Sequence, residues 1–150
     1  MYPDKTPSER EYLICKEKKA VFLMNIGNKL SNGLIHDDRA ADYDDWALNG
    51  DLLLYYPLLD MAFEVSIMGI RVNKDSLMSQ LAEKNDLFKL DMPYHQSILK
   101  DELPLTIGGG IGQSRLCMYM LNKAHIGEVQ SSFWNKEDIE EFKKHNIILL

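Results

Sequence analysis

The sequence is poor in the features that mark secreted and membrane-spanning proteins. It has only two cysteines, Cys15 and Cys117, and no CxxC pair, so we expect neither a disulfide framework nor a cysteine-based metal site. No apolar run approaches the roughly 18 residues of a membrane-spanning helix, and the run over 52–59 is broken by Pro57. The N-terminal residues carry charges and prolines in place of the apolar segment of a secretory signal. These absences predict a protein of the reducing cytoplasm with no membrane partner.

Positive charge is also scarce. Lys and Arg together number 17 against 23 for Asp and Glu, which gives a net charge of -6. This balance repels a phosphate backbone unless basic residues gather on one face. Nucleic acid is therefore not an expected partner, although a pocket for a single nucleotide stays open. The 45% hydrophobic fraction and the 150-residue length are typical of one packed domain, which we place over residues 1–150.

The N-terminal third combines one helix, one strand and a long irregular segment. Thr6, Pro7 and Glu9 have the pattern of a capping box, which predicts a helix up to about Lys18. The apolar run over 20–26 shows no alternation, so we expect a central strand covered on both faces. Residues 28–49 lose all periodicity and are rich in Asp, Asn and Gly, which indicates either function or disorder.

The rest of the chain predicts an antiparallel strand pair and several helices. Two β-favouring runs over 48–56 and 61–68 are separated by four residues, a spacing that favours a hairpin or a meander. Asn73 can cap a helix over 74–84 in which Leu77, Met78 and Leu81 share one face. Two further helices are expected, over 93–99 and, capped by Asn135, over 137–144.

A glycine-rich segment gives the sharpest local signal. A strand ending at 107 leads into Gly108, Gly109, Gly110 and Gly112, and a helix follows with Arg115 on its first turn. Such glycines permit positive φ and let a ligand approach the backbone, but a tight turn that needs small residues is the alternative. The segment matches neither the dinucleotide fingerprint nor the P-loop. A guanidinium on the first helical turn can lie against a base or pair with a phosphate.

Two carboxylates form the candidate metal site. Asp51 and Glu64 fall on the two strands of the predicted hairpin, where side chains on one face can share a cation. Oxygen ligands of this kind suit Mg²⁺, while two solvated strand residues are the alternative. Glu64 lies in an otherwise apolar run, so a charge without a function there would carry a desolvation cost.

No Ser or Cys has a nucleophile motif. His36 beside Asp37 is a candidate general base, and His95 and His125 are isolated, but each of the three is more often a surface or capping histidine than a catalyst.

Several blocks together closely resemble the aspartate–ammonia ligase family, the ammonia-dependent asparagine synthetases. They read RAADYDDW over 39–46, LNGD over 48–51, AFEVSIMGIRV over 62–72, TIGGGIGQSRL over 106–116 and HIGEVQ over 125–130. The family resembles the catalytic core of class II aminoacyl-tRNA synthetases, and the glycine-rich block resembles the third signature motif of that class. The resemblance implies an antiparallel sheet flanked by helices, incomplete on its N-terminal side.

The resemblance also implies a reaction and roles for individual residues. The complete enzyme would use ATP and Mg²⁺ to adenylate the side-chain carboxylate of L-aspartate, and ammonia would then displace AMP to give asparagine. Asp51 and Glu64 would hold Mg²⁺, and Arg115 would cover the adenine or the outer phosphate. The remaining expected contacts are a base against Gly108, Gly109, Gly110 and Gly112, ribose or substrate at Asp44 and Asp45, and aspartate or nucleotide at Ser66 and Arg71.

The chain departs from the family in length. Members are about twice as long, and the sequence resembles only their C-terminal half, without the first two signature motifs. We therefore expect a truncated reading frame, a split gene or a cloned fragment, a homodimer only in the complete enzyme, and no turnover by this chain alone. Ile67 replaces a second serine after Ser66, which weakens the expected substrate contact there. The alternatives are a non-catalytic nucleotide-binding remnant and a fragment of an aspartyl- or asparaginyl-tRNA synthetase.

Overall fold

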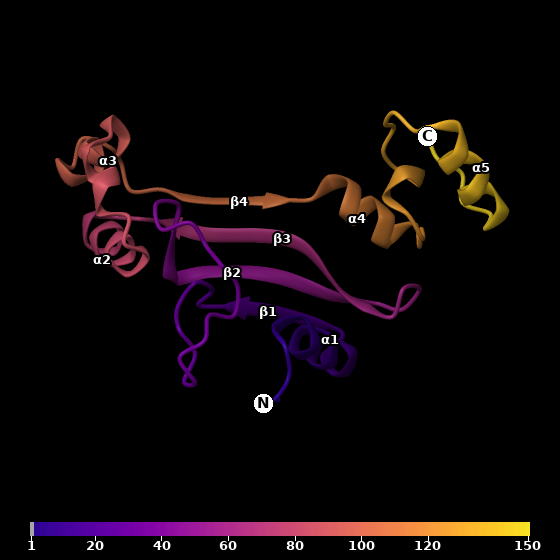
Figure 1. Ribbon diagram of the computed structural model, residues 1–150, viewed down its shortest axis with the longest axis horizontal. Coiled ribbons are helices and arrows are strands. Elements are labelled where there is room, and N and C mark those ends of the chain that lie inside the picture. Colours follow the sequence, from indigo (N-terminus) through magenta and orange to yellow (C-terminus); the bar gives the residue numbers. More distant parts are fainter. Residues whose placement is uncertain (1) are drawn as a thin grey trace. The chain divides into compact units, whose positions relative to one another are not determined.

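The computed structural model describes residues 2–150 and has the expected α+β composition (Figure 1). Within these residues, five α-helices and two short 3₁₀ helices accompany four strands. In chain order the elements are α1 (Pro7–Lys18), β1 (Ala20–Met24), β2 (Asp44–Tyr56), β3 (Met61–Arg71), α2 (Lys74–Lys84), η1 (Leu87–Asp91), α3 (Pro93–Leu99), β4 (Ile107–Ile111), α4 (Gln113–Met120), η2 (Ile126–Glu128) and α5 (Lys136–Lys144). No helix among them is long and apolar enough to cross a membrane.

The strands form one antiparallel sheet in the order β1-β2-β3-β4. The hairpin prediction is confirmed, because β2 and β3 are neighbours joined by residues 57–60. However, β2 begins at Asp44, so the irregular segment ends earlier than the sequence indicated. β2 begins with two aspartates, yet Asp44 and Trp46 are both buried, so burial alternates along the chain as it does in a strand. Asp44 can be buried because Arg71 donates a hydrogen bond to its carboxylate, and a hydrophobicity pattern does not reveal such a partner.

The prediction of a central position for the first strand is wrong. β1 lies at one edge of the described sheet, and Phe22 and Met24 are 46% and 57% exposed. An apolar run without alternation shows that the segment is hydrophobic, but it does not show how many strands or helices lie beside it. The chain leaving β1 is nevertheless fixed, since Asn49 donates to the backbone oxygen of Ile26 and accepts from its nitrogen, both at 2.8 Å.

The residues divide by their contacts into two compact units. One comprises the described residues up to Val21, Leu53–Ser66 and Ile111–Leu150, and the other comprises Phe22–Leu52 and Ile67–Gly110. We refer to them as the terminal unit and the middle unit. The assignment of all residues to a single domain stays a prediction.

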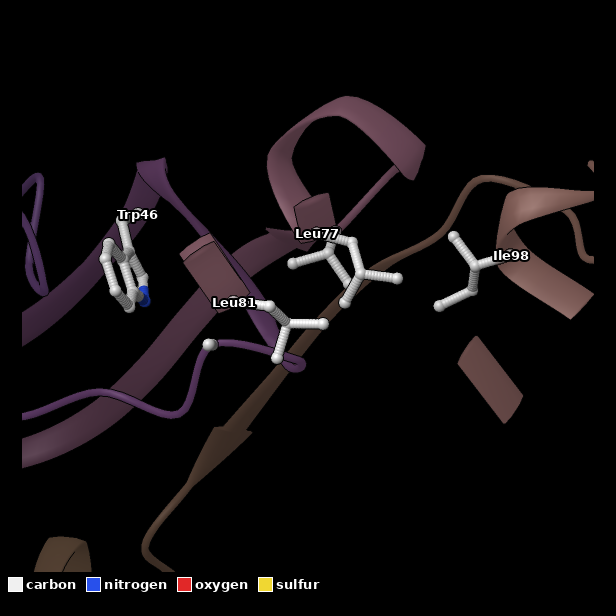
Figure 2. Packing of buried hydrophobic residues seen from close by; sticks show 6 residues of the cluster. Trp46, Leu77, Leu81 and Ile98 are labelled. Atoms are coloured by element: carbon white, nitrogen blue, oxygen red, sulfur yellow. The ribbon is translucent and has the colours of Figure 1, made fainter. Parts of the chain in front are cut away.

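The middle unit has a core built around α2 (Figure 2). Its buried members are Ala41, Trp46, Val72, Leu77, Leu81 and Ile98. Asn73 caps α2 as expected, but Met78 is 43% exposed, and Gln80 occupies the buried face beside Leu77 and Leu81. Gln80 is tolerated there because its side chain accepts from the backbone of Trp46 and donates to two carbonyls of the preceding segment.

The terminal unit is held by caps and by one buried tyrosine. The capping box of Thr6 and Glu9 starts α1, and Asn135 caps α5, as the sequence predicts. Tyr56 is 1% exposed, and its hydroxyl lies 3.0 Å from the carbonyl oxygen of Met118 and 2.7 Å from that of Lys123. These contacts fix the C-terminal end of α4 against the end of β2.

Candidate active site

Arg115 lies on the first turn of α4 and contacts Glu64 on β3. Its Nη1 donates to Oε1 of Glu64 at 2.8 Å and to the backbone oxygen of the same residue at 3.1 Å. This contact agrees with the expectation that Arg115, which follows the glycine-rich segment, projects towards the acidic face that carries Glu64. The arginine side chain remains 49% exposed, so the carboxylate orients a guanidinium that stays open to solvent. This pair offers an oriented positive charge to an anionic or aromatic ligand.

The start of α4 explains why the arginine reaches the glutamate. The backbone nitrogen of Gly112 donates to the carbonyl oxygen of Val65 at 2.9 Å, which joins the start of the helix to the residue after Glu64. Gly112 is the N-cap residue of α4, and a Cβ there would lie 3.3 Å from that of Arg115. A small residue at this position therefore leaves room for the arginine stem.

Arg71 and Asp44 form a second oriented pair, within the middle unit. Nη1 of Arg71 donates to Oδ1 of Asp44 at 2.5 Å, and the guanidinium carbon lies 3.7 Å from the centroid of the Tyr43 ring. The side chain of Asp44 is 3% exposed, and its Oδ2 is buried with no hydrogen-bond partner among the described residues. A buried carboxylate oxygen of this kind favours a ligand that donates hydrogen bonds, such as a ribose or an amine.

The glycine segment is a strand, so the expected turn with positive φ is wrong. Gly108, Gly109 and Gly110 belong to β4, and among the described glycines only Gly27 and Gly33 have positive φ. Steric room explains part of the run, because a Cβ at Gly108 would collide with the guanidinium of Arg71. A Cβ at Gly110 meets nothing within 4 Å. The approach of a nucleotide base to these glycines stays a prediction.

Asp51 also pairs with an arginine. Oδ2 of Asp51 accepts from Nη2 of Arg39, and the two side chains are 7% and 16% exposed. Carboxylate oxygens are suitable Mg²⁺ ligands, but both predicted ligands, Asp51 and Glu64, already contact a guanidinium. No cluster of three or more His, Cys, Asp or Glu side chains with metal-site geometry occurs in the described part of the chain. The residues thus do not form a preformed magnesium site, and a shared cation stays a prediction.

The other expected residues have defined surroundings but untested roles. Asp45 Oδ1 accepts from the backbone nitrogen of Ala47 at 2.9 Å, so its carboxylate is engaged within β2. Ser66 is 4% exposed, and its hydroxyl has no hydrogen-bond partner among the described residues. Sequence reasoning missed Arg39 and Tyr43 as individual residues. The signal for Arg39 was a lone arginine in an acidic irregular segment, where a nearby carboxylate partner is expected.

The comparisons with known proteins agree on one family. A family model described as Aspartate-ammonia ligase matches residues 1–146. A curated aspartate–ammonia ligase of Ruminiclostridium cellulolyticum is 57% identical over 150 residues, which are 100% of this chain and 45% of that protein. One of Bacillus cytotoxicus is 60% identical over 148 residues, which are 99% of this chain and 45% of that protein.

Solved structures confirm the fold. An asparaginyl-tRNA synthetase of Entamoeba histolytica is 20% identical, with a TM-score of 0.51 over 87% of this chain and 29% of that chain. Its complex with asparaginyl-adenylate has a TM-score of 0.52 with the same coverage. This likeness confirms the synthetase-like sheet flanked by helices that the sequence resemblance implies.

The chain spans slightly less than half the length of the curated relatives it matches, 45% for the first of them. The family model nevertheless covers nearly the whole chain, and the identity to these relatives is 57% and 60%. The chain therefore belongs to the aspartate–ammonia ligase family.

Proposed function

We propose that the chain forms part of an ATP-dependent aspartate–ammonia ligase. The reaction joins the side-chain carboxylate of L-aspartate to AMP with release of pyrophosphate, and ammonia then attacks the acyl adenylate to give asparagine and AMP. The observation that carries the proposal is the pairing of Arg115 with Glu64 within blocks that match the family throughout. Oriented charge with no protein nucleophile suits nucleotidyl transfer, which depends on positioning and charge neutralisation.

Each oriented pair has a part in this proposal. Glu64 holds one face of the Arg115 guanidinium, and its free donors bind the nucleotide by stacking on the base or pairing with a phosphate. Asp44 fixes Arg71 over the Tyr43 ring, and its buried Oδ2 accepts from a ribose hydroxyl or from the amine of aspartate. Ser66 and Asp45 line the substrate side, and Gly108, Gly109, Gly110 and Gly112 lie against the base.

Mg²⁺ is expected as the ion that accompanies ATP. When bound, such an ion neutralises charge on the phosphates. Because Asp51 and Glu64 are each paired with an arginine, we assign no individual step to the ion. The residues of this chain bind and orient the substrates whether or not these carboxylates reach the metal.

The ligase proposal is preferred to its alternatives. Relatives named aspartate–ammonia ligase are 57% to 60% identical to this chain, whereas the tRNA synthetase of similar fold is 20% identical. The net charge of -6 also disfavours a tRNA-binding fragment. We further propose that the complete enzyme is a cytoplasmic homodimer and that this chain alone makes no asparagine, because the rest of the catalytic domain supplies other substrate contacts.

Adenylation can be tested in a chimera. In the aspartate–ammonia ligase of Ruminiclostridium cellulolyticum, this chain replaces the matching segment, and aspartate-dependent exchange of labelled pyrophosphate into ATP is measured. We expect exchange in the chimera and a loss of about a hundred- to a thousandfold on Arg115→Met, the usual cost of removing one oriented charge-stabilising donor. Lys144→Met is the matched control, since it removes an exposed ion pair with Glu141. Exchange that is unaffected by Arg115→Met, or absent while the parent enzyme shows it, contradicts the proposal.

A further inference from the structure

A buried histidine outside the proposed substrate contacts reaches the segment that carries two of them. His95 of α3 is 4% exposed, and its Nε2 lies 3.1 Å from Oδ2 of Asp42. An ionised carboxylate only accepts hydrogen bonds, so Nε2 of the ring carries the donated proton. Nδ1 is buried and has no hydrogen-bond partner among the described residues. The hydrogen bonding of this imidazole is thus directed at Asp42.

The elements behind His95 are fixed to the middle unit. Ile98, one turn after His95 on α3, belongs to the core around α2 (Figure 2). From the preceding η1, Nζ of Lys89 lies 3.7 Å from the same Oδ2 of Asp42. The carboxylate therefore receives one donor from α3 and one positive charge from η1. Both supports belong to the same compact unit as Asp42 itself.

Asp42 directly precedes the two residues that orient Arg71. The guanidinium carbon of Arg71 lies 3.7 Å from the ring centroid of Tyr43, and its Nη1 donates to Oδ1 of Asp44 at 2.5 Å. Gln80 donates to a backbone carbonyl on each side of Asp42, which fixes the path of the chain there. The hydrogen bond from α3 adds a hold on the Asp42 side chain.

This hold matters because Asp42 and Asp44 are close along the chain. Two residues of extended chain span at most about 7 Å, so a released Asp42 carboxylate competes with Asp44 for the Arg71 guanidinium. The Asp42 side chain is 25% exposed, which leaves it room to turn. While His95 holds Asp42, the guanidinium of Arg71 is left to Asp44.

We propose that His95 is a positioning residue of the substrate site, which through Asp42 fixes the segment that orients Arg71. The inference deepens the proposed function and rests on it, because that function assigns a substrate to the buried Oδ2 of Asp44 and to the segment around it. His95 itself contacts neither a substrate nor the reacting atoms. Removing such a support weakens substrate binding, since a misplacement of about 1 Å can cost on the order of a hundredfold.

Nuclear magnetic resonance of the 150-residue chain tests the positioning without any substrate. We expect His95→Phe, which keeps a ring but removes the donor, to shift the amide signals of Tyr43 and Asp44 and the guanidinium signals of Arg71. His95→Gln keeps a donor at the end of its side chain and should return these signals towards their wild-type positions. Unmoved signals in a folded His95→Phe variant, or equal shifts in both variants, overturn the proposal.

Gln96→Leu is the matched control on the same helix. The Gln96 side chain donates to the carbonyl oxygen of Leu90 at 2.7 Å, so this variant also removes a hydrogen bond of α3, but not the one to Asp42. We expect it to leave the Arg71 signals in place, and shifts as large as those of His95→Phe contradict the proposal. If His95→Phe does not fold, Asp42→Ala breaks the same hydrogen bond from its more exposed side and should shift the Arg71 signals.

Pyrophosphate exchange in the chimera shows whether the positioning serves substrate binding. We expect His95→Phe to raise, about ten- to a hundredfold, the KM of the substrate whose KM also rises on Asp44→Asn, with a smaller change in the maximal exchange rate. His95→Gln should recover most of this affinity, and Gln96→Leu should leave both KM values unchanged. A lower maximal rate with unchanged KM values overturns the role in binding.

The two measurements separate this inference from the proposed function. Shifted Arg71 signals in His95→Phe, together with a wild-type chimera that shows no exchange, support the hold on Asp42 and contradict the ligase proposal. Unmoved Arg71 signals together with normal exchange overturn the positioning role of His95 and leave the ligase proposal intact.

Discussion

Substituting alanine for Gly108 tests whether the glycines of β4 make room for Arg71. A Cβ at this position would collide with the guanidinium, which pairs with Asp44 and covers the Tyr43 ring. The guanidinium has to move, because the alternative is a shift of the strand backbone. Asp44, with its side chain 3% exposed, then loses the cation that compensates its charge.

The expected cost follows from this burial. Removing one partner of a buried ion pair costs about 3–5 kcal/mol, and inserting a methyl group into a packed site costs about 1–3 kcal/mol. The Arg71 side chain is 22% exposed and can keep a weaker contact with Asp44 after moving, so the cost of inserting the methyl group is the better guide. We expect Gly108→Ala to reduce the free energy of unfolding by about 1–3 kcal/mol.

Urea denaturation followed by Trp fluorescence measures this change, and Gly110→Ala is the matched control. Gly110 lies in the same strand, but an added Cβ there meets nothing within 4 Å. In the background of Arg71→Met, the effect of Gly108→Ala should shrink, since the colliding guanidinium is gone. Equal destabilisation by Gly108→Ala and Gly110→Ala would refute the steric explanation.

Three further predictions concern stability. Hydrogen bonds, above all from Tyr55, lower the pKa of Asp60 from 3.8 to about 2. The stability advantage of the wild type over Asp60→Asn should therefore be complete above about pH 4 and decrease towards pH 2. Parallel plots of unfolding free energy against pH for the two proteins would contradict this prediction. Tyr56→Phe removes the hydroxyl donor from the carbonyls of Met118 and Lys123, of which the Met118 carbonyl still accepts from the backbone nitrogen of Lys123, and should cost about 1–3 kcal/mol in urea unfolding. Leu81→Ala should cost about 2–5 kcal/mol, and a loss no larger than that of the exposed Met78→Ala would contradict the assigned core.

Local chemistry made part of this fold predictable. The caps at Thr6, Asn73 and Asn135 depend on a side chain and on backbone amides within three residues, so the sequence alone specifies where these helices begin. The hairpin of β2 and β3 follows from two β-favouring runs and a short connection. Arg115 contacts Glu64 as expected, although 51 positions separate the two residues, so local geometry alone does not specify this contact.

Features that depend on distant partners were not predictable in the same way. The position of β1 at an edge is decided by which strands are present beside it. The glycine composition predicts a turn where β4 lies, because composition does not reveal that Arg71 fills the space above Gly108. The Arg39–Asp51 pair joins a loop to a strand across twelve positions, and only the folded loop brings them together.

The central claim is that this chain supplies part of an aspartate–ammonia ligase, and synthesis of asparagine tests it most directly. The chimera with the Ruminiclostridium cellulolyticum ligase and the 150-residue chain alone are each incubated with ATP, Mg²⁺, L-aspartate and ¹⁵N-ammonium. We predict that the chimera forms ¹⁵N-asparagine and AMP in equal amounts and that the chain alone forms neither above the enzyme-free control. A folded chimera that makes no asparagine, while the parent enzyme does so under the same conditions, would contradict the claim.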